Sequence, residues 1–215
     1  MENMENLNKA YLSVLDTDKN ENNRLEYLIS MYSNKEDLSH QDLIDLLNIS
    51  LIDEWLAEFN YFASYNLSKT DGKADFDPEF QQHEDEEREH RKMIVNRLRE
   101  LDSPVPITPL LDFQKLNSNG MKWAQEFNTE SAKILLNRYN EELDAIKFYD
   151  LILNVIHRLK ETGGFDSTTH QIIKKIKADE ETHAKDLRDL LVERNLLETS
   201  EDVKVTSDED EDEQI

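Results

Sequence analysis

Residues 80–101 read FQQHEDEEREHRKMIVNRLREL, and this stretch decides the fold because it joins a helical apolar pattern to charge at its centre. Steps of three or four residues place one set of side chains on a single helix face. The middle of this face carries Glu87 and His90, where a packing helix is normally apolar. Charged side chains are buried almost only when they are paired or bind a metal, so both residues need partners. The whole predicted face comprises Phe80, His83, Glu87, His90, Ile94, Leu98 and Leu101.

Residues 173–190 repeat this pattern, with Glu180 and His183 again three positions apart on an otherwise apolar face. Two further helices are predicted over residues 41–67 and 128–160, and each carries a Glu followed seven positions later by a Tyr. The chain therefore contains two similar halves, each with a Glu-x6-Tyr helix and a Glu-x-x-His helix. The three other predicted inner faces comprise Leu47, Leu51, Glu54, Glu58, Tyr61, Phe62 and Tyr65; Leu135, Tyr139, Glu142, Ile146, Tyr149, Ile152 and Ile156; and Ile173, Ile176, Glu180, His183, Leu187 and Leu190.

The second and third predicted helices are joined by DSPVPITPLLDFQ, residues 102–114, whose three prolines exclude a helical interior. Ten to thirteen extended residues span about 30 to 45 Å, the length of a helix of about 20 to 30 residues. This connection can therefore return the chain from one end of a bundle to the other. The pattern predicts an all-α fold, a four-helix bundle with a long crossover between its second and third helices rather than an up-down-up-down bundle.

Three regions are predicted along the chain. Residues 1–38 form an N-terminal helical extension that packs outside the bundle or at a subunit contact. Residues 39–197 form the bundle, and Ser39 is a predicted N-cap with Asp42 at the position of a capping box. Residues 198–215 carry nine acidic residues and one lysine with little apolar content, so we expect a disordered acidic tail.

The composition excludes several classes of function. A net charge of −23 argues against a nucleic-acid partner, since phosphate binding needs clustered Lys and Arg. The chain has no Cys, which excludes disulfides, thiolate metal sites and cysteine catalysis. No apolar run approaches the roughly 18 residues of a membrane span, and the N-terminus lacks the apolar stretch of a signal peptide. We therefore expect a soluble, cytoplasmic protein with no membrane partner.

Four carboxylates and two imidazoles that converge inside a bundle are typical of a site for two transition-metal ions. Without metal, four inward Glu side chains would bury four negative charges, which two divalent cations neutralise. Residues three apart on a helix point the same way, so the Glu and His of one helix can bind the same ion. The predicted ligands are Glu54 and Glu142, each capping one ion, Glu87 and Glu180 bridging both, and His90 and His183 as terminal ligands.

Some of these assignments have rivals in the sequence. Glu58 competes with Glu54, Glu141 with Glu142, and Glu86 with Glu87, and the matched spacing to a tyrosine favours Glu54 and Glu142. His83 lies one turn before Glu87 and is an extra ligand, a structural residue or a surface residue. Tyr61 and Tyr149 are either core aromatics or partners of the metal ligands in catalysis. Three other histidines, His40, His157 and His170, are considered incidental.

Four segments carry a resemblance to a known family: DEWLAEFNYF (53–62), HEDEEREHRKMIVNRL (83–98), EELDAIKFY (141–149) and ADEETHAKDL (178–187). Together they resemble the four helices of the ferritin-like superfamily, and particularly the bacterioferritin and Dps-like proteins, over residues 40–195. The resemblance implies a di-iron carboxylate centre that oxidises Fe(II) with O2 or H2O2. It also implies a homo-oligomer, often a hollow shell that stores the ferric mineral.

The expected function is that of a ferroxidase-type oxidoreductase that sequesters iron and protects against oxidative stress, with two iron ions per subunit, or manganese in their place. The Cys pair that many Dps-like proteins carry near the site is absent, and the extension and the acidic tail depart from the common pattern. Two other uses of the metals remain, a di-manganese catalase and a di-iron oxygenase. A third alternative is a structural or interaction protein that kept the bundle.

Overall fold

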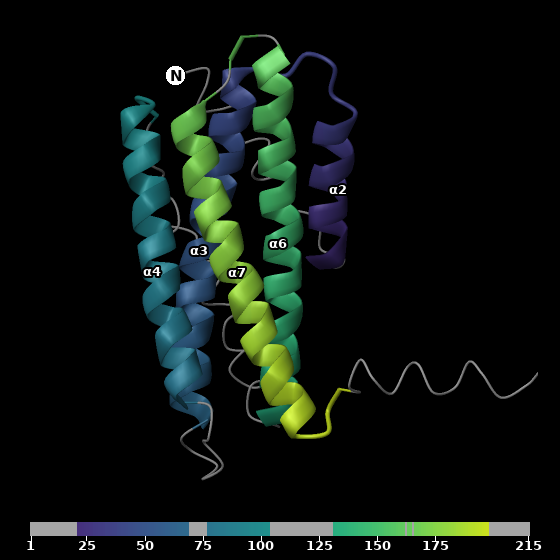
Figure 1. The fold of residues 1–215 in the computed structure, drawn as a ribbon, viewed down its shortest axis with the longest axis vertical. Helices are drawn as coiled ribbons and strands as arrows, with labels where there is room; N and C mark the ends of the chain where they lie inside the picture. The colour runs from purple at the N-terminus through teal and green to yellow at the C-terminus, as the bar shows by residue number, and fades with distance from the viewer. Residues whose placement is uncertain (1–20, 69–76, 104–130, 162, 165, 198–215) are drawn as a thin grey trace, which may run out of the picture.

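The computed structural model describes residues 21–68, 77–103, 131–161, 163–164 and 166–197, and this part of the chain contains five α-helices and no strand. The predicted all-α fold is confirmed (Figure 1). The predicted crossover, the first 20 residues and the acidic tail lie outside the described residues. Within the described part, no helix is long and apolar enough to cross a membrane. The helices are α2 (Glu21–Ser33), α3 (His40–Ser68), α4 (Asp77–Glu100), α6 (Ser131–Glu161) and α7 (Ser167–Glu193).

The four long helices form two antiparallel hairpins, α3 with α4 and α6 with α7. Within each hairpin the backbones approach closely, whereas helices of different hairpins stand farther apart. Arg97, near the end of α4, donates to Asp166, which precedes α7, at 2.7 Å. The ends of α4 and α6 therefore lie at the same end of the bundle, and the two helices run parallel (Figure 1). A parallel second and third long helix is the arrangement of the predicted bundle with a long crossover rather than of an up-down-up-down bundle.

Two apolar clusters fill the bundle, one on each side of a polar middle. Each fully buried Leu or Ile contributes about 1.5–3 kcal/mol, so these clusters hold the helices around a centre that is costly to bury. The larger cluster lies at the end where α3 begins and includes Leu43, Leu46, Leu47, Leu51, Ile94, Leu98, Ile152, Val155, Ile156, Ile173 and Ile176. The smaller cluster, toward the other end, comprises Tyr61, Phe80, Ile134, Leu135, Leu187 and Leu191.

Helix α2 packs outside the four long helices, along α6 (Figure 1). Its residues Leu28 and Tyr32 are buried and join the larger apolar cluster. The Arg158 side chain on α6 donates hydrogen bonds to the backbone carbonyls of Tyr32, at 2.7 Å, and of Lys35. The last turn of α2 is therefore fixed to α6 by both apolar packing and a cation at its C-terminus.

Local sequence signals set the helix ends. Ser39 and Asp42 form a capping box: the Asp42 carboxylate accepts from the Ser39 backbone N–H at 2.8 Å, and Ser39 Oγ accepts from the Asp42 N–H at 3.4 Å. Helix α6 ends at a turn in which Gly163 has φ +86° and the Gly164 N–H bonds the Leu159 carbonyl at 2.8 Å, as in a Schellman motif.

The prediction that Phe62 faces the core is wrong. The Phe62 side chain is 50% exposed, because it follows Tyr61 directly and a helix turns about 100° per residue, so only one of the two can face the core. The buried position belongs to Tyr61, and Phe62 lies on the outer surface with Phe59, which is 46% exposed. The other departures are small, since Leu101, Tyr65, Tyr139, Ile146 and Leu190 are partly buried.

Candidate metal centre

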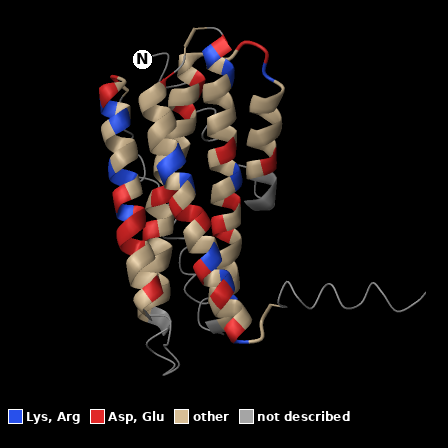
Figure 2. Cartoon of the chain, in the orientation of Figure 1, with Lys and Arg blue, Asp and Glu red and all other residues tan. Residues whose placement is uncertain are grey.

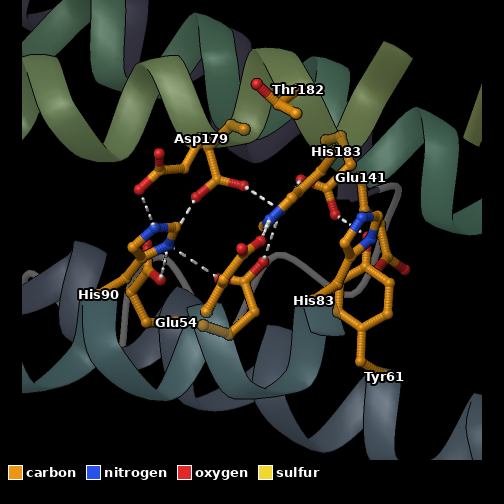
Figure 3. Close-up of polar contacts among 12 residues, drawn as sticks. Glu54, Tyr61, His83, His90, Glu141, Asp179, Thr182 and His183 are labelled. Atoms are coloured by element: carbon orange, nitrogen blue, oxygen red, sulfur yellow. Dashed lines mark hydrogen bonds and ion pairs between the residues drawn. The ribbon is translucent and has the colours of Figure 1, made fainter. Parts of the chain in front are cut away.

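The structure brings the six predicted ligands together in the middle of the bundle, and each is at most 4% exposed. Figure 3 labels three of them, Glu54, His90 and His183. The apolar residues on the same helix faces lie in the two clusters, so the Glu and His between them must also face inward. The ligands come from all four long helices: Glu54 from α3, Glu87 and His90 from α4, Glu142 from α6, and Glu180 and His183 from α7.

The six side chains form two overlapping groups, in each of which the ligand atoms lie within 4.8 Å of one another. Both groups contain Glu87 and Glu180. One group adds Glu54 and His90, and the other adds Glu142 and His183. The two groups therefore fit two neighbouring ions that share two carboxylates, with one further Glu and one His for each ion.

The Nδ1 atom of each imidazole faces three carboxylates. His90 Nδ1 lies 3.3 Å from Glu54 and Glu87 and 3.0 Å from Glu180. His183 Nδ1 lies 3.3 Å from Glu87 and Glu180, and 3.7 Å from Glu142 in the same arrangement. The two halves of the centre are therefore close to symmetric.

The other nitrogen of each imidazole bonds an acid that sequence reasoning did not assign. His90 Nε2 lies 3.0 Å from Asp179 Oδ2, and His183 Nε2 lies 2.7 Å from Glu86 Oε2. Each acid directly precedes the Glu of the opposite Glu-x-x-His pair, so α4 and α7 exchange these contacts. Such acids orient the ring of a metal-binding histidine and raise its basicity. The sequence signal was present, since Glu86 was a rival of Glu87, but its role depends on the facing helix.

The two tyrosines also cross between the hairpins. Tyr61 on α3 donates its hydroxyl hydrogen bond to Glu142, and Tyr149 on α6 donates to Glu54. Ser50 Oγ lies 3.0 Å from the Tyr149 hydroxyl. Burial, followed by the adjacent Glu carboxylate, raises the pKa of both tyrosines well above the ordinary value, so both keep their protons. Each tyrosine thereby holds a predicted terminal ligand in place.

The rival carboxylates lie outside the two groups. Glu58 accepts from Arg88 and Arg91, at 2.8 Å in each case. Glu141 accepts from Arg138 at 2.6 Å, and its side chain is 43% exposed. The structure therefore places Glu54 and Glu142, rather than Glu58 and Glu141, beside the shared pair.

Burial and mutual repulsion change the acidity of the carboxylates. Burial, followed by repulsion from Glu87, raises the pKa of Glu54 well above its ordinary value. Burial, followed by repulsion from Glu180, raises the pKa of Glu142 to about 7. Burial would also raise the pKa of Glu87, but the imidazoles of His183 and His90 beside it outweigh burial and lower that pKa.

The imidazoles respond in the opposite sense. Burial alone would lower the pKa of His90 and of His183, but each ring faces three carboxylates that favour its charged form, and the pKa of both is raised. The metal-free centre therefore balances its charge with protons, held on both imidazoles and on some of the carboxylates.

The residues present fit a pair of divalent cations. Four ligand atoms have no hydrogen-bond partner within the described chain: Glu54 Oε2, Glu87 Oε1, Glu180 Oε1 and His183 Nδ1. Buried polar atoms are rarely left without partners, and carboxylate oxygens with imidazole nitrogens are the donor set of iron and manganese sites.

His83 lies beside the centre but outside both groups. It is 1% exposed, its ring stacks on His183 with centroids 4.0 Å apart, and its edge meets Tyr61 at 5.1 Å (Figure 3). Burial, followed by the charge of His183, lowers the pKa of His83 to about 3, so this imidazole is neutral. The structure thus does not bring His83 among the ligands of the two shared groups.

Comparison with known proteins agrees with this fold. The family model of the ferritin-like domain matches residues 44–197. Among solved structures, a dodecameric thioferritin, the bacterioferritin-related protein of Bacteroides fragilis, is 30% identical and superposes with a TM-score of 0.57. This match covers 79% of the present chain and 95% of that protein. None of the curated proteins matches the chain.

Proposed function

Because the chain belongs to the ferritin-like domain family, we propose that it binds two iron ions per subunit, oxidises Fe(II) with O2 or H2O2, and sequesters the product. Iron is the substrate in this proposal, and the oxidation limits its reaction with peroxide elsewhere in the cell. With H2O2 the reaction balances as two Fe(II), one H2O2 and two protons giving two Fe(III) and two water molecules.

The observation that carries the proposal is the pair of overlapping ligand groups that share Glu87 and Glu180. Shared carboxylates hold two ions close enough to deliver two electrons to one oxidant. Four buried ligand atoms in this cluster have no hydrogen bond to any described residue, which is the state expected of atoms that bind cations.

The chain's own residues have distinct roles in this proposal. Glu54 and His90 hold one iron, Glu142 and His183 hold the other, and the shared carboxylates lie between them. Asp179 and Glu86 orient the two imidazoles through their Nε2 atoms. Tyr61 and Tyr149 keep a proton at the hydroxyl and position the terminal carboxylates.

We further propose that the protein acts in the cytoplasm as a homo-oligomer, with a hollow shell as its assembled form. The related thioferritin is dodecameric, which supports an assembly of many copies. The exposed Phe62 on α3 is an apolar side chain available for such contacts.

The test is anaerobic titration with Fe(II), followed by admission of H2O2 and measurement of Fe(III) formed per chain. We expect two tightly bound ions and rapid oxidation in the wild type. Glu87→Gln should lose most of both, because it removes a shared ligand. Glu89→Gln is the matched control, since Glu89 is 64% exposed on the same helix and pairs with Lys92. Equal binding and oxidation by both variants would refute the proposal.

The same preparation separates the alternative functions. Manganese retained after purification, with O2 released from peroxide, would identify a catalase. Turnover of an added organic substrate with O2 would identify an oxygenase. A wild type that binds no divalent metal would leave the structural role, which the convergence of all six ligands argues against.

A further inference from the structure

His83 is a buried polar side chain that the proposed pair of ions does not explain. His83 is 1% exposed, and neither of its ring nitrogens has a hydrogen-bond partner within the described residues. A neutral imidazole carries one N–H donor and one acceptor nitrogen. Leaving such groups buried and unbonded costs about 1–3 kcal/mol each, so a missing partner is the simplest account of this residue.

A carboxylate faces one of these nitrogens across a gap that suits an ion. His83 Nε2 lies 3.8 Å from Asp186 Oδ2. This distance is too long for a hydrogen bond, whose heavy atoms lie about 2.7–3.2 Å apart. Two metal–ligand bonds of about 2.1 Å can bridge up to about 4.2 Å, so one cation fits between the two atoms.

The position lies beside the main centre. The Asp186 side chain is 34% exposed, whereas the His83 side chain is 1% exposed, so the pair joins a partly exposed carboxylate to a buried imidazole. His83 lies one helical turn from Glu87 on α4, and Asp186 lies one turn from His183 on α7. Acidic residues are frequent along the middle of α4 and α7, and their negative charge favours the approach of cations (Figure 2).

We propose that His83 and Asp186 form a third site for a divalent transition-metal ion, with water completing the coordination. Imidazole and carboxylate together suit iron, manganese, cobalt or zinc rather than magnesium or calcium. With only two protein ligands, this site binds more weakly than the two shared sites. The inference rests on the proposed function for the identity of the natural ion, Fe(II), but the site itself is defined by residues outside both ligand groups.

The test uses Co(II), which binds such ligands without being oxidised, in equilibrium dialysis with metal analysis. We expect the wild type to bind two ions tightly and a third more weakly. His83→Phe keeps an aromatic ring against His183 but has no ligand atom, and Asp186→Asn removes the charge at the surface. Each should weaken the third ion at least tenfold and retain the two tight ions.

Asp189→Asn is the matched control for lost charge. Asp189 lies one turn farther along α7, is 54% exposed and bonds Lys185, so its substitution should retain all three ions. A wild type with two ions only, or a third ion that survives in both His83→Phe and Asp186→Asn, would overturn the inference. A wild type that binds no Co(II) would instead overturn the proposed function. If His83→Phe fails to fold, Asp186→Asn alone decides the result.

Discussion

At the scale of single residues, the metal-free centre is held together by protons. His90 and His183 have raised pKa values and are charged at neutral pH, while the pKa of Glu142 is about 7 and that of Glu54 is raised further above the ordinary value. Metal ions bind the deprotonated forms of all four ligands. Loading the centre must therefore expel these protons.

We accordingly predict that metal binding releases protons and strengthens with pH. The raised pKa values mean that His90, His183, Glu54 and Glu142 hold protons at pH 6 and lose them to the metal, so affinity should rise about tenfold per pH unit for each proton released. Calorimetric titration with Co(II) in buffers of different ionisation enthalpy should give about two to four protons per chain at pH 7. Release of no protons would contradict the assigned charge balance.

A second prediction concerns the hydroxyl of Tyr149, which bonds Glu54. Tyr149→Phe removes this hydrogen bond and leaves Glu54 free to turn, so we expect metal affinity to fall by about tenfold, the lower end of effects seen when partners of ligands are removed. Unfolding of the metal-free protein should also become easier by about 1–2 kcal/mol. Tyr27→Phe, at a hydroxyl on a 55% exposed ring, is the control and should change neither quantity.

At the scale of helices, much of the structure follows from short-range pattern. The capping box at Ser39 and Asp42 was readable because caps depend on residues three apart. The inward face of α4 was readable because Phe80, Ile94 and Leu98 fix its direction on both sides of the polar pair. These features are local, so one sequence suffices to predict them.

The contacts that the sequence did not predict are those between helices. Asp179 bonds His90 and Glu86 bonds His183 only because α4 and α7 face each other in one register. Phe62 was placed inward because pattern alone does not fix the rotation of α3 between two adjacent aromatic residues. The gap between His83 and Asp186 likewise depends on two helices far apart in the chain.

The N-terminus of α7 gives a prediction for one helix. Asp166 caps it, accepting from the Thr169 N–H at 2.9 Å and from Arg97 at 2.7 Å. Asp166→Ala should destabilise the protein by about 2 kcal/mol in urea unfolding. Glu100→Ala, which removes the 59% exposed second acid partner of Arg97, should cost less than about 1 kcal/mol.

The effect of the Asp166 cap should depend on pH. Burial would raise the pKa of Asp166, but the bonds from Thr169 and Arg97 outweigh it and lower that pKa. The contribution of Asp166 to the free energy of unfolding is therefore complete above the ordinary pKa of about 3.9 and is lost as the pH falls through the lowered pKa. The stability difference between wild type and Asp166→Ala should shrink below about pH 4, and a constant difference would contradict this origin.

The turn after α6 gives a further prediction. Gly163 has φ +86°, a conformation that side chains with a Cβ adopt only with strain, so Gly163→Ala should destabilise the protein by about 1 kcal/mol. Gly164→Ala is the comparison, because a Cβ there would lie 3.4 Å from the Leu159 carbonyl, an ordinary contact. Its effect in the same unfolding experiment should be about 0.5 kcal/mol or less.

At the scale of the whole molecule, α2 is joined to the bundle by the apolar packing of residues such as Leu28 and Tyr32 and by hydrogen bonds from Arg158. Arg158→Ala removes the cation that donates to the carbonyls of Tyr32 and Lys35 and leaves the apolar contacts of α2. We expect faster hydrogen exchange in α2, by about tenfold, with unchanged exchange near Glu87 and unchanged Co(II) binding. Slower metal binding in this variant would show that α2 influences the centre.

The wider spacing between the two hairpins has a mechanical consequence. Each hairpin supplies half of the ligands, and both tyrosines bond across to the other hairpin, so a bound pair of ions would cross-link two hairpins whose backbones are farther apart. Removal of the ions by a chelator would then weaken the contact between the hairpins before either hairpin unfolds, so the metal-free protein would separate first between α3–α4 and α6–α7.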